Sequence, residues 1–336
     1  MQHELRAIAQ STAVKQALLQ AFNTTEISDI TLLAGGLSAA PVFRITVNGG
    51  QYVLKTNLPT DSPARPRTNC MELAANAGIA PQLHYLDHNT GISITGFIQP
   101  QPMQARLGAG LLPALAQTIR RIHALPLFAA DSNSLPETID GLIAEFKASG
   151  MLQGPAFDDA LSCYDTLRRN YPWSDPDKVS SHNDLNPNNI VFDGERIWII
   201  DWDAAYANDR YVDLAITANF YVPDETREQL FLAAYFGEAP TEYQRARFFL
   251  MQQVCRMIYS LLFFRLAASS APAGQVHDPA MQDIRLADVK MLLGSGQLSL
   301  AAYEGQLLFG KALWNEALLH MQSPRFDPSL ERVRKA

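Results

Sequence analysis

Four polar residues near the middle of the chain have the types and the spacing that phosphoryl transfer requires. His182, Asp184 and Asn189 form the pattern H-x-D-x-x-x-x-N, and Asp201 follows a short apolar segment. In phosphoryl transfer one carboxylate orients the attacking hydroxyl and accepts its proton, while a carboxamide and a second carboxylate hold the metal that bridges the ATP phosphates. The pattern predicts Asp184 as the catalytic carboxylate, with Asn189 and Asp201 as ligands of a magnesium ion.

These side chains need two elements to bring them together. The loop between Asp184 and Asn189 must turn, and Pro187 helps to fix that turn. The segment VFDGERIWIID predicts a β-hairpin around Asp193, which returns Asp201 to the same place. Carboxylates are often structural and H-x-D triplets occur by chance, but the full pattern followed by two strands is far more specific than a lone motif.

A glycine-containing loop and a strand lysine upstream predict a nucleotide site. In LLAGGLSAAPVFRI, the backbone amides of Gly35, Gly36 and Ser38 can approach phosphates between two predicted strands, although a plain β-turn is the alternative. The segment YVLK places Lys55 on the third strand, from which kinase lysines reach the phosphates and pair with a helix glutamate. Glu72 is the predicted partner, because the other nearby acids lie in a proline-rich loop or later in the chain.

The segment SHNDLNPNNIVFDGERIWIIDWD resembles the Brenner motif of choline kinases and aminoglycoside phosphotransferases, which are relatives of the protein kinases. GIAPQLHYLDHNTGISITGFI and IIDWDAAYANDRYVDLA resemble further segments of bacterial choline and ethanolamine kinase-like proteins. With the glycine loop included, the resemblance covers about residues 30–220. It implies a two-lobed fold like that of protein kinases, ATP and magnesium as cofactors, and a small molecule as the phosphoryl acceptor.

The resemblance also implies roles for residues outside the pattern. His182 is implied to be structural, supporting the catalytic loop by hydrogen bonds rather than acting as a base. Asp203 is implied to add to metal or substrate binding, and Asp213 to brace the catalytic loop. Backbone hydrogen bonds to adenine are implied for one segment: Thr95, Phe97 and Ile98.

The periodicity of apolar residues predicts an α+β fold with two lobes. The small lobe, residues 1–98, is predicted to contain a helix over 3–22, strands over 30–33, 42–47, 51–56, 83–86 and 92–98, and a helix over 69–76. Pro100 and Pro102 break regular structure and place the boundary there. The larger lobe, residues 99–336, is predicted to be mainly helical, with helices over 111–125, 137–149, 157–170, 225–236, 241–269, 280–295 and 299–321.

The composition argues against several classes of partner. A net charge of -7 argues against a nucleic-acid surface, which needs clustered lysine and arginine. The three cysteines show no CxxC spacing, so neither a disulfide framework nor a thiolate metal site is indicated. No segment is apolar enough to span a bilayer, and the N-terminus lacks the apolar stretch of a secretory signal. We therefore expect a cytoplasmic protein with no nucleic-acid or membrane partner; the oligomeric state stays open.

The acceptor is expected to be a small molecule rather than a protein. Asn183 stands where protein kinases carry an arginine, and the short segment after Asp201 leaves no room for an activation loop. Because the base, the metal ligands and the lysine are all present, a catalytically silent nucleotide-binding pseudokinase is the less favoured alternative.

The resemblance favours a cationic amino-alcohol such as choline or ethanolamine as the acceptor, with an aminoglycoside or thiamine as alternatives. Choline binding uses an aromatic cage, for which Tyr259, Phe263 and Phe264 are candidates, although such a stripe is more often core. Three acids that could supply negative potential for a cation are Asp203, Asp209 and Asp224.

Overall fold

Each of the two compact units of the protein takes segments from separate parts of the chain. The computed structural model describes residues 8, 11–33, 41–56, 69–103, 110–131, 134–149, 154–174, 178–275 and 284–335. Unit 1 comprises Met1–Ser132 and Val179–Asn208, and unit 2 comprises Asn133–Lys178 and Asp209–Ala336. Unit 1 therefore holds residues 1–98 together with the segment that carries the H-x-D-x-x-x-x-N pattern; the predicted division at residue 98 stays a prediction.

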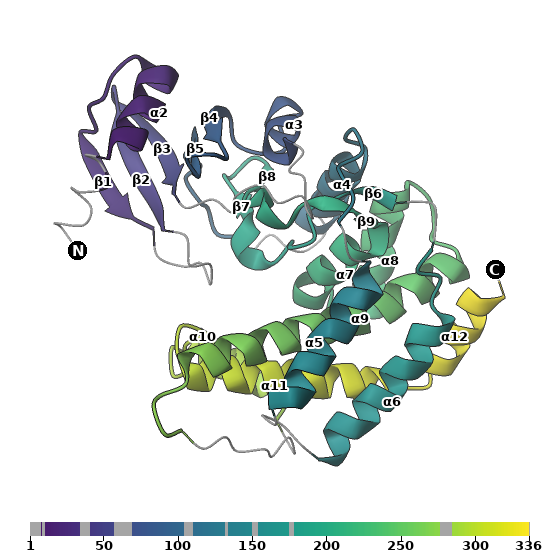
Figure 1. Ribbon diagram of the computed structural model, residues 1–336. Helices are drawn as coiled ribbons and strands as arrows, with labels where there is room; N and C mark the ends of the chain where they lie inside the picture. Colours follow the sequence, from purple (N-terminus) through teal and green to yellow (C-terminus); the bar gives the residue numbers. More distant parts are fainter. Residues whose placement is uncertain are drawn as a thin grey trace. The chain divides into compact units, whose positions relative to one another are not determined.

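Unit 1 is built on a five-stranded antiparallel sheet with the strand order β1-β2-β3-β5-β4 (Figure 1). Its strands are β1 (Asp29–Leu32), β2 (Val42–Val47), β3 (Gly50–Lys55), β4 (Leu83–Asp87) and β5 (Ile92–Gly96). Asn48 and Gly49 join β2 to β3, and both have the positive φ that a type I′ turn requires. The predicted hairpin is thus confirmed.

The core of the sheet lies under an N-terminal helix. Helix α2 (Thr12–Phe22) begins after Ser11, whose hydroxyl accepts a hydrogen bond from the amide of Val14. The buried residues of α2 and of the strands form one cluster: Val14, Ala17, Leu18, Phe43, Ile45, Val47, Leu54, Ile92 and Ile94. The expected helix over 3–22 is therefore present over Thr12–Phe22, and residues 1–7 and 9–10 lie outside the described part.

The remainder of unit 1 carries the pattern of polar residues. Two helices, α3 (Cys70–Asn76) and α4 (Leu111–His123), precede it in the chain. The pattern itself spans short elements: β6 (Lys178–Ser181), the 3₁₀ turn η2 (Pro187–Asn189), β7 (Ile190–Phe192), β8 (Ile197–Ile199), the 3₁₀ turn η3 (Trp202–Ala204) and β9 (Tyr206–Asp209). β7 pairs with β8 as an antiparallel hairpin, and β6 pairs with β9.

The described part of unit 2 is helical. Its helices are α5 (Leu135–Ser149), α6 (Pro155–Asn170), α7 (Arg210–Tyr221), α8 (Glu225–Phe236), α9 (Glu242–Ser270), α10 (Leu286–Gly294), α11 (Tyr303–Met321) and α12 (Phe326–Arg334). The long helix α9 begins with a capping box between Thr241 and Gln244, and it packs against α5, α7, α11 and α12 (Figure 1). Together the units form an α+β fold, as predicted.

Candidate active site

The loop that contains Asp184 begins at the end of β6, where the buried His182 anchors it. The Nε2 atom of His182 lies 3.0 Å from the carbonyl oxygen of Ile200, and its ring packs edge-on against Trp202 with centroids 4.8 Å apart. The ring is fully buried. His182 thus links the catalytic loop to the residues that flank Asp201.

Asp184 is held by two carboxamides of its own loop. Asn186 donates from Nδ2 to Asp184 Oδ1 at 2.9 Å, and Asn189 donates from Nδ2 to Asp184 Oδ2 at 2.9 Å and to the Asp184 carbonyl at 2.8 Å. Pro187 opens the 3₁₀ turn η2, whose N-terminal residue Asn186 also accepts from the amide of Asn188. The loop therefore turns between Asp184 and Asn189 and brings their side chains into contact.

The β7–β8 hairpin returns the chain to this loop. The amide of Ile200 donates to the carbonyl of Asn189 at 3.0 Å, so Asp201 follows directly after a residue that pairs with the loop. Asp201 itself has φ +62, a left-handed conformation that costs energy for a residue other than glycine. Asn183, which precedes Asp184, has φ +64. Sparsely populated backbone conformations therefore occur on both sides of the site.

Lys55 binds two carboxylates of the catalytic segment at once. Its Nζ lies 2.7 Å from Asp201 Oδ1 and 2.8 Å from Asp203 Oδ2. Burial lowers the pKa of Lys55, but the negative charges of Asp201 and Asp203 and their hydrogen bonds outweigh burial and raise the pKa above its usual value. The ammonium group is therefore charged at neutral pH and neutralises part of this acidic pair.

The oxygen atoms present here suit a magnesium ion. Because Asn189 uses its Nδ2 toward Asp184, its Oδ1 is oriented as an acceptor, and Asp201 and Asp203 add hard carboxylate oxygens. In the part of the chain that the structure describes, no group of three or more His, Cys, Asp or Glu side chains is arranged to hold a metal. Magnesium commonly takes one or two protein carboxylates and completes its shell with water and substrate phosphates, so this donor set fits it.

The remaining nucleotide-site predictions have different outcomes. Gly35, Gly36 and Ser38 lie outside the described residues. Glu72 is exposed on α3, and the ion pairs that Lys55 makes in the described chain are with Asp201 and Asp203 rather than with Glu72. The role of Glu72 stays a prediction.

The predicted adenine-binding segment begins on β5, an interior strand of the sheet in unit 1. Thr95 lies on β5, opposite Val53 of β3. The amide of Phe97 donates to the carbonyl of Gln51 at 3.2 Å, and Ile98 is half-buried. Adenine binding by this segment stays a prediction.

In unit 2, Asp213 lies on α7 and is fully buried. Its bracing role also stays a prediction. Two of the aromatic candidates serve the core, because Phe264 stacks on Phe146 at 4.9 Å and Phe263 packs edge-on against Phe309 at 4.8 Å.

The three acids expected to attract a cation are each paired with a basic side chain. Asp203 binds Lys55, Asp209 Oδ2 lies 2.5 Å from Arg247 Nη2, and Asp224 Oδ2 lies 2.8 Å from Arg227 Nη1. Each of these carboxylates is therefore partly neutralised within the protein, and Asp203 shares the charge of Lys55 with Asp201. Their contribution to a negative potential stays a prediction.

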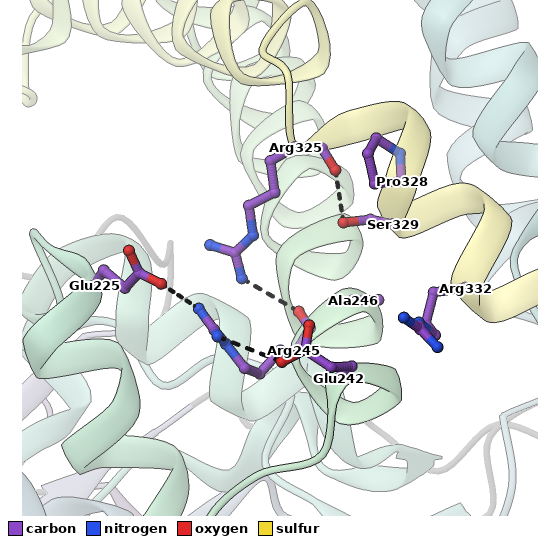
Figure 2. Close-up of a pocket in the computed structure, with 8 residues that line it drawn as sticks. All are labelled: Glu225, Glu242, Arg245, Ala246, Arg325, Pro328, Ser329 and Arg332. Carbon is purple, nitrogen blue, oxygen red and sulfur yellow. Dashed lines mark hydrogen bonds and ion pairs between the residues drawn. The ribbon is translucent and has the colours of Figure 1, made fainter.

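Unit 2 contains a separate cavity of about 300 Å³ beside the N-terminal turns of α8, α9 and α12 (Figure 2). Arg245 lies 2.5 Å from Glu225 and 3.7 Å from Glu242, and Arg325 binds the buried Glu228 through two hydrogen bonds of 2.6 and 2.8 Å. These arginines are matched by glutamates, so the polar side chains here hold three helices together.

The sequence did not predict the contacts that Asn183 and Asn208 make beside Asp184. Asn183 was noted only for the absence of an arginine, and Asn208 was not considered. The available signal was an asparagine next to the catalytic aspartate, because asparagine tolerates a left-handed backbone better than most residues.

No described helix is both long enough and apolar enough to cross a membrane.

Comparison with known proteins gives sequence matches to phosphotransferases. The profile of the family described as "Phosphotransferase enzyme family" matches residues 29–249. An aminoglycoside 3'-phosphotransferase from Salmonella typhimurium is 31% identical over 121 residues, which are 33% of this chain and 44% of that protein. The matched segment thus spans less than half of that relative's length.

Solved structures share the fold over most of the chain. A choline/ethanolamine kinase family protein from Mesorhizobium loti superposes with a TM-score of 0.63 at 19% identity, covering 97% of this chain and 100% of that one. A spectinomycin phosphotransferase, in complex with ADP and spectinomycin, gives a TM-score of 0.58 at 14% identity, covering 92% and 99%. Choline kinase LicA from Streptococcus pneumoniae gives 0.57 at 17% identity, covering 81% and 94%. The predicted kinase-like fold is thereby confirmed.

Proposed function

Because this chain belongs to the phosphotransferase enzyme family, we propose that it transfers the γ-phosphoryl group of ATP to a hydroxyl group of a small molecule. The observation that carries the proposal is the arrangement in unit 1, where Asn189 contacts Asp184 and Lys55 joins Asp201 to Asp203. Phosphoryl transfer depends mainly on positioning and on charge stabilisation, and these residue types supply both.

Each residue has a distinct task in the proposed reaction. Asp184 orients the acceptor hydroxyl and takes its proton as the oxygen attacks the γ-phosphorus. A bond forms between that phosphorus and the acceptor oxygen, the bond to the ADP oxygen breaks, and ADP leaves. Asn186 and Asn189 hold the Asp184 carboxylate in place by donating to its two oxygens.

The nucleotide is proposed to bind through side chains and backbone of unit 1. Lys55 supplies a positive charge for the phosphates, and Asn189, Asp201 and Asp203 are the residues that would hold magnesium. A bound magnesium ion would neutralise charge that develops on the phosphate oxygens.

The acceptor is proposed to be a cationic amino-alcohol such as choline or ethanolamine. The compounds named for the similar proteins, choline, ethanolamine, spectinomycin and aminoglycosides, all combine a hydroxyl with an amine or ammonium group. The proposal rests on this shared chemistry rather than on Asp203, Asp209 and Asp224, each of which contacts a basic side chain.

The test is an assay of ADP release with ATP and magnesium, run with the purified chain. The panel contains choline, ethanolamine, thiamine, spectinomycin, an aminoglycoside and a neutral sugar, and Asp184→Asn serves as the inactive control. ADP release that requires an amino-alcohol and disappears in the control is expected. Preference for the neutral sugar would refute the proposal of a cationic acceptor but not the proposal of phosphoryl transfer. ATP binding without turnover of any acceptor would refute the proposal that the chain is a kinase.

A further inference from the structure

The side chain of Asn183 makes contacts on both sides of the catalytic segment. Its Nδ2 lies 3.3 Å from the carbonyl of Ser181, 3.0 Å from that of Ala204 and 3.3 Å from that of Tyr206. Its Oδ1 accepts a hydrogen bond of 2.8 Å from Nδ2 of Asn208. One carboxamide therefore spans from the end of β6 to the residues that follow Asp203.

The backbone of Asn183 explains why an asparagine suits this position. The residue has φ +64, which glycine adopts freely and asparagine tolerates better than most others. Glycine would satisfy the backbone but provide no side chain, whereas a longer polar residue would be strained. Asparagine provides both the left-handed backbone and a polar side chain. It turns the chain immediately before Asp184 and also donates to the neighbouring carbonyls.

Asn208 supports the same contact from β9. It is 5% exposed, and its Nδ2 also lies 3.3 Å from the hydroxyl of Tyr206. A buried carboxamide that lost its partner would leave polar atoms unsatisfied, so the Asn183–Asn208 contact is expected to define a single arrangement of the two segments.

We propose that Asn183 and Asn208 are positioning residues, which set the placement of the Asp184 carboxylate relative to Asp201 and Asp203 for phosphoryl transfer. The inference rests on the proposed kinase function. Asn183 is adjacent to Asp184, and the carbonyl of Ala204 that it contacts belongs to the residue after Asp203. A displacement of the base by about 1 Å can cost about a hundredfold in rate, so a contact that fixes this placement acts mainly on kcat.

The test uses variants that separate the backbone from the side chain. Asn183→Gly keeps the left-handed conformation and removes the carboxamide, while Asn208→Ala removes the donor to Asn183 Oδ1. The matched control is Asn48→Gly, because Asn48 is another asparagine with positive φ, in the β2–β3 turn of the same unit. The kcat and the KM for ATP are measured with the best acceptor of the panel. Calorimetric titration with ATP gives the concentration of nucleotide-binding sites, and kcat is expressed per binding site.

We expect Asn183→Gly to lower kcat by about 10- to 100-fold, with the KM for ATP changed less than about threefold. Asn208→Ala should lower kcat by about tenfold, and the double variant should lose less than the product of the two, because both changes break one contact. Asn48→Gly should retain wild-type kcat.

Other outcomes would overturn the inference. A wild-type kcat per binding site in Asn183→Gly, or independent effects in the double variant, would show that the carboxamide pair serves only stability. A wild-type protein that turns over no acceptor would instead refute the proposed function on which the inference rests.

Discussion

At the scale of single residues, Lys55 decides the charge balance of the candidate site. Its ammonium contacts one oxygen of Asp201 and one of Asp203, and its side chain is 10% exposed. Like charges in a partly buried site repel unless a counter-charge lies between them. Lys55 therefore allows Asp201 and Asp203 to approach each other, and it opposes any second cation that binds the same oxygens.

Replacing Lys55 by glutamine should tighten the binding of a divalent cation to the nucleotide-free protein. Without the ammonium, Asp201 and Asp203 have no cation between them, so we expect the Kd for Mn²⁺ to fall by at least about tenfold. Electron paramagnetic resonance of free Mn²⁺ measures this directly without turnover. Lys147→Gln, which removes an exposed lysine on α5, is the control. An unchanged Kd for Mn²⁺ in Lys55→Gln would show that Lys55 does not oppose cation binding at Asp201 and Asp203.

Asp184→Asn should abolish turnover while ATP binding persists. The substitution keeps the size of the side chain but removes the proton acceptor, whose contribution as a general base is about 10²- to 10⁴-fold. Rates of ADP release and calorimetric titration with ATP are the two measurements, and Asp158→Asn on α6 is the matched exposed control. Turnover within tenfold of wild type would show that another group accepts the proton.

The sequence was sufficient to select Asp184, Asn189, Asp201 and Lys55 as candidates, because their chemistry depends on residue type and spacing. It did not indicate the ion pairs that Lys55 makes with Asp201 and Asp203. These pairs depend on the left-handed turn at Asp201 and on the 3₁₀ turn that follows, and neither has a local apolar pattern. Elimination among acids nearby in sequence suggested Glu72, whereas the structure pairs Lys55 with residues far along the chain.

At the scale of elements, one glutamate links the last helix to the rest of unit 2. Glu228 on α8 is 5% exposed and accepts two hydrogen bonds from Arg325, whose guanidinium also lies 4.6 Å from the ring centre of Phe249 on α9. Arg245 on α9 approaches the same carboxylate at 3.5 Å. The start of α12 is therefore held by charge as well as by apolar packing.

Glu228→Gln should destabilise the protein by about 1 to 2 kcal/mol, because it removes the charge from a buried carboxylate that accepts two hydrogen bonds from Arg325. Urea unfolding followed by far-ultraviolet circular dichroism reports on the helices of unit 2. The control is Glu331→Gln, which removes an exposed carboxylate 3.3 Å from Lys335 and should leave the unfolding midpoint unchanged. Equal midpoints for both variants would contradict the role of Glu228.

Local signals explain which elements could be predicted. The Asn48 turn and the Asp193 turn marked two hairpins, and Asp193 accepts hydrogen bonds from the amides of Glu195 and Arg196. The chain was expected to be helical from Leu214 onward, but the bounds of α7 were not predicted. Its residues from Tyr211 to Ala218 are all buried, which removes the amphipathic period. Helix α12 was not predicted, and it contains Pro328 in its first turn, where proline is tolerated.

At the scale of the whole molecule, a buried carboxyl at the start of the second segment of unit 2 links stability to pH. Asp209 caps α7 by accepting from the amide of Tyr211, and it also accepts from the hydroxyl of Tyr171 at 2.8 Å and from Arg247. Burial raises the pKa of Asp209 to about 6, although these hydrogen bonds and the charges of Arg210 and Lys178 favour the ionised form.

The free energy of unfolding should therefore fall as the pH rises from about 4 to 6. Below this range the Asp209 carboxyl is protonated in both the folded and the unfolded chain, and above it the carboxyl is ionised in both. Between these limits unfolding releases a proton. The pKa of Asp209 differs by roughly 2 units between the folded and the unfolded chain, which corresponds to about 3 kcal/mol in the free energy of unfolding.

The Asp209→Asn variant cannot titrate at this position. The free energy of unfolding of wild type minus that of the variant therefore isolates the contribution of this carboxyl. Urea unfolding of both proteins from pH 4 to pH 7.5 should give a difference that decreases to a plateau above pH 6. A difference that is constant, or that increases with pH, would show that Arg247 and the hydrogen-bond donors hold Asp209 ionised throughout.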